Sequence, residues 1–165
     1  MTADEIRTHL RYSGWASQRL LDAALKLDME QLSRDMQVSH KSVLDTLSHI
    51  YFADRIWFSR VVDPQEAAPP SSLTPDELST QWRRIQNRWE EWAESLTDAD
   101  LERVVHYKSI KGDPYENHLG QILLHVVNHA TLHRGQVMAM LRQHGVAPPP
   151  TDLIGYYRHM AAAHG

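Results

Sequence analysis

Cysteine is absent from this chain of 165 residues. Disulfides, thiolate metal ligands and a cysteine nucleophile are therefore excluded, and any sulfur chemistry would need an external thiol. Long apolar runs are also absent, and the acidic start of the sequence lacks the charged-then-apolar order of a secretory signal. We expect a cytoplasmic protein that does not use a membrane as a partner.

A concentrated basic stripe is missing as well. The formal net charge is -4, and the Lys and Arg residues are scattered along the chain, which argues against nucleic acid as a partner. Hydrophobic residues at 42% and charged residues at 23% are ordinary for a globular protein. A chain of this length can bury one sizeable core, so we expect a single domain over residues 1–165.

Hydrophobic residues recur at helical spacing in several segments. Thr74, Pro75 and Glu77 have the order of an N-cap, a first-turn proline and a capping-box acid. Gly145 is a natural stop for the last long segment. This pattern predicts four long helices, over about Ala3–Leu27, Ser39–Val62, Pro75–Ser95 and Leu119–His144.

The remaining segments predict connections. Residues 63–75 are rich in proline and serine and indicate a loop, while Thr97 can cap a short turn. Residues 104–118 favour a small hairpin around "KGDP" or an irregular crossing loop, and Thr151 or Asp152 can start a short last helix through His159. We predict an all-α four-helix bundle with a long third-to-fourth helix connection and a short C-terminal helix.

Histidine is the unusual presence, with 11 residues dispersed along the chain. His129 and His133 lie one turn apart on the predicted helix, separated by about 40° and on the side of the apolar residues. We expect this pair to face the core, either as ligands of a divalent metal or as hydrogen-bonded structural histidines. His125 is turned about 80° from His133, which makes it the weaker ligand candidate.

A third ligand would favour the metal interpretation, and His49 lies on the inward side of the second predicted helix. Three neutral imidazoles leave coordination positions open and leave the ion doubly positive. Asp45 and Asp54 flank His49, and we interpret both as solvent-facing acids. No other catalytic signature is present, such as His-Glu-x-x-His, Gly-x-Ser-x-Gly or a phosphate-binding glycine loop.

The other histidines are expected at the surface, with His9 as the first exception because its helix can pass near the pocket. They are His9, His40, His106, His118, His144, His159 and His164. Trp15, Trp57 and Trp82 should pack in the core, with Trp15 or Trp57 at a pocket mouth.

The segment "HVVNHATLHRGQVMAMLRQHG" resembles the fourth-helix motif of the DinB/YfiT-like family, His-x-x-x-His-Arg-Gly-Gln. "YSGWASQRLLDAAL" is similar to the first-helix pattern of that family, with Ser17 where asparagine is usual. "LSHIYFADRIWF" and "PPTDLIGYYR" resemble its second helix and its tail. The resemblance implies an up-down-down-up bundle, a divalent metal held by His49, His129 and His133, and commonly a homodimer.

Characterised relatives of that family include thiol-dependent S-transferases and a mycothiol-dependent maleylpyruvate isomerase. The resemblance therefore implies a metalloenzyme that activates a low-molecular-weight thiol for transfer to a small electrophilic substrate. A metal-dependent hydrolase and a non-catalytic binding protein remain alternatives. Zinc and nickel are the first metal candidates, and iron, manganese and copper also suit imidazole ligands.

Three further residues of the motif have expected roles. We expect Arg134 to tie its helix to a neighbour, because its helical angle places it away from His129. Gln136 is a candidate hydrogen-bond partner of a ligand. Gly135 would permit close helix packing, because a glycine inside a helix otherwise costs about 1 kcal/mol.

Overall fold

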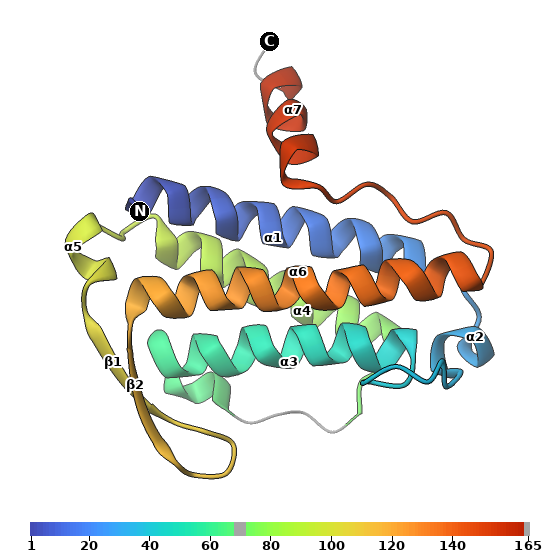
Figure 1. Ribbon diagram of the computed structural model, residues 1–165, viewed down its shortest axis with the longest axis horizontal. Coiled ribbons are helices and arrows are strands. Elements are labelled where there is room, and N and C mark those ends of the chain that lie inside the picture. Colours follow the sequence, from blue (N-terminus) through green and yellow to red (C-terminus); the bar gives the residue numbers. More distant parts are fainter. Residues whose placement is uncertain (68–71, 164–165) are drawn as a thin grey trace.

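Four long helices form a bundle in the computed structural model, which describes residues 1–67 and 72–163. They are α1 (Ala3–Ala24), α3 (Val43–Val61), α4 (Pro75–Ala93) and α6 (Leu119–Gln143). In Figure 1, α1 and α6 run in one direction and α3 and α4 in the other. Both α1 and α3 pack against α4 and against α6, so the predicted up-down-down-up bundle is confirmed.

Side-chain caps fix where these helices begin. Thr2 accepts a hydrogen bond from the Glu5 backbone N–H, and the Glu5 carboxylate accepts one from the Thr2 backbone N–H. Thr74 and Glu77 form the same reciprocal pair at the start of α4, as predicted. Each pair satisfies backbone donors that the first helical turn leaves without a partner.

The first helix ends earlier than predicted. It stops at Ala24, and a short helix that the sequence analysis missed, α2 (Met29–Ser33), follows. Asp28 caps α2 by accepting from the Gln31 backbone N–H. An aspartate at this position competes with continuation of the helix, because its side chain stabilises a new N-terminus.

The third helix begins later than the predicted Ser39. Its N-cap is Ser42, whose Oγ accepts from the Asp45 backbone N–H at 3.0 Å. Gln37 and Lys41 have φ angles of 57° and 62°, so the chain turns sharply just before the helix. Residues 39–41 therefore belong to a loop, which changes the position of His40.

The connection between α3 and α4 contains the short helix η1 (Pro64–Ala67). The rest of the predicted loop includes residues 68–71, which lie outside the described residues. Glu66 anchors η1, because its buried carboxylate pairs with Arg55, Arg84 and Arg88.

The connection between α4 and α6 carries the predicted hairpin. A short helix, α5 (Asp98–Leu101), precedes the antiparallel strands β1 (Val104–Lys108) and β2 (Pro114–His118). Tyr107 pairs with Tyr115 across the strands. Gly112, with a φ of 95°, lies in the turn, where its positive φ favours glycine.

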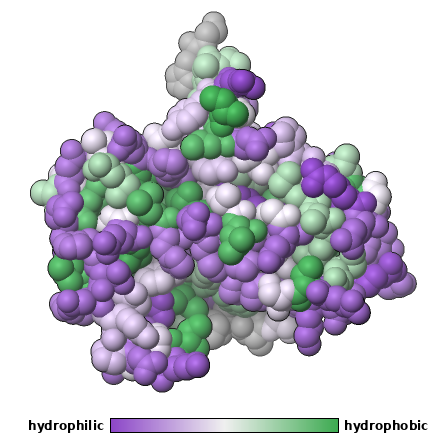
Figure 2. Space-filling model, viewed as in Figure 1, coloured by the Kyte–Doolittle hydropathy of each residue, from purple (hydrophilic) through white to green (hydrophobic). Residues whose placement is uncertain are grey.

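The last helix, α7 (Leu153–Ala163), projects from the bundle beside α1 (Figure 1). Its base is held by Tyr12, whose hydroxyl donates to the Thr151 carbonyl at 2.9 Å. Hydrophilic residues cover most of the face shown in Figure 2, and hydrophobic side chains form separate patches, including one on α7. None of the helices in the described residues is long and apolar enough to cross a membrane.

Candidate metal centre

His129 and His133 of α6 lie one above the other on the side of the helix that meets α3. Their ring centroids are 4.5 Å apart. His133 is buried with 7% of its surface exposed, whereas His129 is half-buried. The expectation that both face the core is therefore correct only for His133, and the pair lies at the edge of the bundle.

His49 on α3 meets this pair across the helix interface. Its Nε2 lies 3.0 Å from the Nε2 of His129, and its ring centroid is 4.5 Å from that of His133. A 3.0 Å separation allows a hydrogen bond, and it is also close to the ~3.3 Å expected between two nitrogen ligands of one tetrahedral zinc ion. The structure thus brings together His49, His129 and His133 from two helices.

A fourth imidazole joins them, which corrects the surface position predicted for His40. The His40 ring stacks on His49 with centroids 3.7 Å apart, and it lies 5.0 Å from His133. A helix that began at Ser39, as predicted, would include His40. Because α3 begins after Ser42, His40 lies in the loop that turns over the exposed side of His49.

Ring nitrogens of His40, His49 and His133 lie within 4.8 Å of one another, in a grouping that can hold a metal ion. His129 adjoins the group through its contact with His49. Nitrogen ligands of this kind suit divalent transition metals, and the donor set does not select one metal. The positions and the chemistry of these ring nitrogens therefore support a transition-metal site, but they do not identify the metal.

Burial favours the uncharged form of His40, His49 and His129. Burial, together with the neighbouring histidines, lowers the pKa of both His49 and His129 to about 4. The pKa of His40 is also lowered, first by burial and then by His133, although the carboxylate of Asp45 opposes the shift. Neutral imidazole is the form that binds a metal, so no proton has to be displaced from His49 or His129 at pH 7.

Gln136 fixes the orientation of His133. The Nδ1 of His133 donates to the Gln136 Oε1 at 2.8 Å, since an amide oxygen can only accept. The Nε2 of His133 is then left with its lone pair, as a metal ligand requires. The amide nitrogen of Gln136 lies 3.5 Å from the Ser39 Oγ, so the same residue also contacts the loop that carries His40.

Arg134 ties α6 to α1, as predicted. Its guanidinium is 1% exposed and donates to the Ser13 carbonyl, the Ser13 hydroxyl and the Ser17 hydroxyl. Ser17 of α1 is thus an acceptor for this buried arginine.

Two interpretations from the sequence are wrong. Asp54 is buried rather than solvent-facing, and its Oδ2 accepts from the Trp82 Nε1 at 2.8 Å. Gly135 does not serve close packing, because it is exposed and an added Cβ would meet no atom within 4 Å. Asp45 is exposed, as expected, and bonds to Ser42.

The remaining histidines lie outside the cluster. His106, His118 and His159 are exposed, as predicted, and His144 is the half-buried C-cap of α6. His9 is half-buried on α1, and no contact among the described residues joins it to the cluster. His164 lies outside the described residues.

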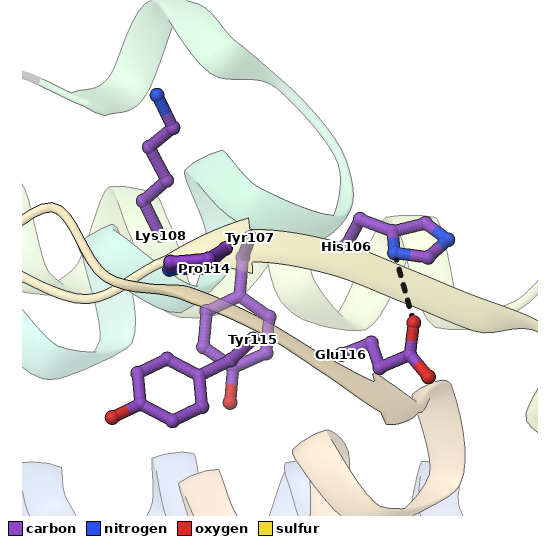
Figure 3. Close-up of a pocket in the computed structure, with 6 residues that line it drawn as sticks. All are labelled: His106, Tyr107, Lys108, Pro114, Tyr115 and Glu116. Atoms are coloured by element: carbon purple, nitrogen blue, oxygen red, sulfur yellow. Dashed lines mark ion pairs between the residues drawn. The ribbon is translucent and has the colours of Figure 1, made fainter.

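A cavity of about 640 Å³ lies elsewhere, against the hairpin. All the residues that line it come from β1 and β2. Figure 3 shows Tyr107 and Tyr115 beside each other, Lys108 pointing the other way, and an ion pair between His106 and Glu116. Both partners of that ion pair are exposed, and no histidine of the cluster lines the cavity, so we do not assign the metal chemistry there.

Comparison with known proteins supports the assignment of the fold and the motif. A model of the DinB family matches residues 1–162. Protein DinB of Bacillus subtilis (strain 168) is 28% identical over 159 residues, which cover 90% of this chain and 91% of the relative. The crystal structure of a DinB-like protein from Bacillus cereus has a TM-score of 0.68 and 22% identity, over 90% of this chain and 97% of that chain. The chain belongs to the DinB family.

Proposed function

We propose that His49, His129 and His133 hold one divalent transition-metal ion. The observation that carries the proposal is the meeting of imidazoles from α3 and α6 at the edge of the bundle, with His133 oriented by Gln136. When bound, such an ion supplies a positive charge that lowers the pKa of a thiol or a water at an open coordination position. Neutral ligands do not reduce that charge, because none of them is anionic.

For the reaction, we propose transfer of a low-molecular-weight thiol to an electrophilic substrate. The chain has no cysteine, so it cannot supply its own sulfur nucleophile. In the described residues, no carboxylate contacts His49, His129 or His133, which leaves no evident general base to favour hydrolysis. The protein's own part is to hold the three rings, to fix the His133 tautomer and to exclude water on the bundle side.

A non-catalytic metal site is the second candidate, and the position of His40 favours it. If His40 were a fourth ligand, the coordination sphere of a tetrahedral ion would be complete and no thiol could enter. The two candidates differ in what His40→Ala does. For an open site we expect the variant to keep one metal per chain, whereas a closed site would lose affinity strongly.

Metal analysis of the chain, prepared without a histidine tag, tests the site. We expect about one metal ion per parent chain and a loss of most of it in His49→Ala and in His133→Ala. His118→Ala is the matched control, because His118 is exposed and lies outside the cluster. Stoichiometric metal in both cluster variants would show that the proposed ligands are wrong.

Titration of the cobalt-loaded protein with 2-mercaptoethanol tests the open position. A saturable change in the cobalt absorption spectrum is expected for thiol transfer. An unchanged spectrum would support the closed, non-catalytic site. Turnover of an electrophile with and without added thiol then separates S-transfer from hydrolysis.

A further inference from the structure

A second, smaller cavity of about 200 Å³ lies where the hairpin covers the groove between α3 and α6. Six residues line it: Trp57 from α3, Tyr107 and Asn117 from the hairpin, and Gln121, Ile122 and His125 from α6. Three separate elements of the fold therefore build its walls. The cavity is distinct from the larger one on the hairpin, with which it shares only Tyr107.

His125 connects this cavity to the histidine cluster. Its ring centroid lies 5.2 Å from that of Trp57 and 5.7 Å from that of His129. The step from His125 to His129 is one helical turn, about 5.4 Å along the axis. The cavity and the proposed metal ligand His129 are therefore neighbours along α6.

The walls favour a flat group. The rings of Trp57 and Tyr107 are nearly perpendicular, with centroids 5.0 Å apart and an interplanar angle of 69°. They offer one aromatic face and one aromatic edge, and Ile122 adds an aliphatic surface. The volume is below the 300–1,000 Å³ typical of a site for a whole drug-sized molecule, so it suits one ring or a short conjugated group.

The walls also favour a group without charge. None of the six lining side chains carries a fixed charge. Arg60 adjoins the cavity, where its guanidinium lies over both aromatic rings and donates to the Lys108 carbonyl. A charged ligand would lose hydration against a lining that carries no charge of its own.

Gln121 offers a hydrogen-bond donor to a ligand. The Tyr107 hydroxyl donates to the Asn117 Oδ1, and the Asn117 Nδ2 donates to the Gln121 Oε1. Gln121 Oε1 also accepts from the His118 backbone N–H. Within the described part of the chain, the Nε2 of Gln121 has no hydrogen-bond partner. A carbonyl or similar acceptor on the ligand would satisfy it.

We propose that this cavity binds a flat, uncharged aromatic or conjugated group that carries a hydrogen-bond acceptor. That this group belongs to the electrophilic substrate rests on the function proposed above, whereas the binding itself does not. The cavity would hold the flat group against Trp57 and Tyr107 while the reactive part of the molecule lies toward His129. Substrate selection would then depend on the hairpin and on Trp57 more than on the histidines.

Binding of benzamide to the full-length protein, followed by NMR of the tryptophan indole N–H signals, tests the proposal. The Trp57 signal is assigned by its absence in Trp57→Leu. We expect benzamide to shift this signal in a saturable way. Cyclohexanecarboxamide has the same polar group on a ring that is not flat, and benzylamine has the flat ring with a positive charge, so both should bind at least threefold more weakly.

Variants locate the site. Benzamide binding, followed by ligand-detected NMR, should weaken about threefold to tenfold in Trp57→Leu, because an aromatic contact is lost. Trp15→Leu is the matched control, since Trp15 is also half-buried and also lies under an arginine, Arg19, but on α1. Gln121→Ala changes an exposed side chain and should weaken binding without a loss of folding. Binding that changes less than twofold in Trp57→Leu and in Gln121→Ala, or equal binding of the three compounds, would overturn the proposal.

The same titration on metal-depleted protein and on His49→Ala separates this proposal from the metal site. We expect benzamide to bind in both, because none of the lining residues is a proposed ligand. Binding that disappears with the metal would show that benzamide coordinates the ion and would reject the cavity. Metal binding that fails while benzamide still binds would reject the proposed function alone.

Discussion

Gln136 determines which nitrogen of His133 is free, because its amide oxygen accepts the Nδ1 proton. Residues of this kind keep a ligand in one tautomer and one orientation before the metal arrives. His49 and His129 have no such amide partner among the described residues, and the Nε2 of one lies 3.0 Å from the Nε2 of the other. The preorganisation of the site therefore depends most on His133 and on its hydrogen bond to Gln136.

We predict that Gln136→Ala weakens metal binding about tenfold to 100-fold, the usual effect of losing a hydrogen bond to a ligand histidine. Competition with a chromophoric chelator measures the affinity. Gln143→Ala is the control, because Gln143 lies on the same helix and is exposed. Equal affinity of the Gln136 variant and the parent would mean that the hydrogen bond does not support the site.

Asp54 is the other residue whose environment has a measurable consequence. Burial raises the pKa of Asp54 to about 7, although the hydrogen bond from Trp82 and the charge of Arg134 act in the opposite direction. Its folded-state pKa thus lies above its ordinary value of about 3.9. Folding favours the protonated acid, so the stabilisation is fully present below about pH 4 and is lost as the pH rises through 7.

The prediction for Asp54→Asn follows from this loss of stabilisation with rising pH. The variant cannot ionise, so its free energy of unfolding relative to the parent should increase from pH 4 to pH 8 by roughly 4 kcal/mol at most. Urea denaturation of both proteins at each pH measures this difference. Asp45→Asn, at an exposed position, should show little change. A variant that loses stability relative to the parent as the pH rises would indicate that an Asp54–Arg134 ion pair dominates instead.

At the scale of elements, the N-terminus of α3 holds the loop that carries His40. Ser42 is 1% exposed, its Oγ accepts from the Asp45 backbone N–H, and it donates to the Asp45 carboxylate. We predict that Ser42→Ala lowers the free energy of unfolding by about 1–2 kcal/mol, since a buried cap leaves its donors unsatisfied.

Thr74→Ala is the matched comparison for that cap. Thr74 caps α4 in the same way but at an exposed position, so water can replace its hydrogen bonds and the cost should be nearer to 0.5–1 kcal/mol. Urea denaturation at one pH compares the two variants. A smaller effect at Ser42 than at Thr74 would contradict the role given to burial.

The starts of the helices and the positions of their side chains also show which features of the fold can be predicted from the sequence and which cannot. Local signals such as the Thr74 and Glu77 capping box predicted the start of α4 correctly. His40 was misplaced because both Ser39 and Ser42 can cap a helix, and the choice between them depends on the positive φ angles of the preceding turn. Asp54 was misplaced because its partner, Trp82, comes from another helix. Contacts between distant segments leave no local pattern in one sequence.

At the scale of the whole molecule, the bundle topology places α3 and α6 side by side although 57 residues separate their ends, from Val61 to Leu119. Because the proposed ligands come from both helices, a bound ion would join two segments that are far apart in the sequence. Such a link exists only in the folded chain, so metal binding and global stability must be coupled.

We predict that a free zinc concentration of 100 times the Kd raises the free energy of unfolding by about 2.7 kcal/mol, which corresponds to roughly 5–11 °C in Tm for a chain of this size. Thermal denaturation with zinc and with EDTA measures the shift. In His49→Ala the shift should fall to nearly zero, because the link between α3 and α6 is lost, while His118→Ala should keep it. A shift that survives in His49→Ala would place the stabilising ion away from the interface between α3 and α6, and the proposed metal centre would then have to be moved.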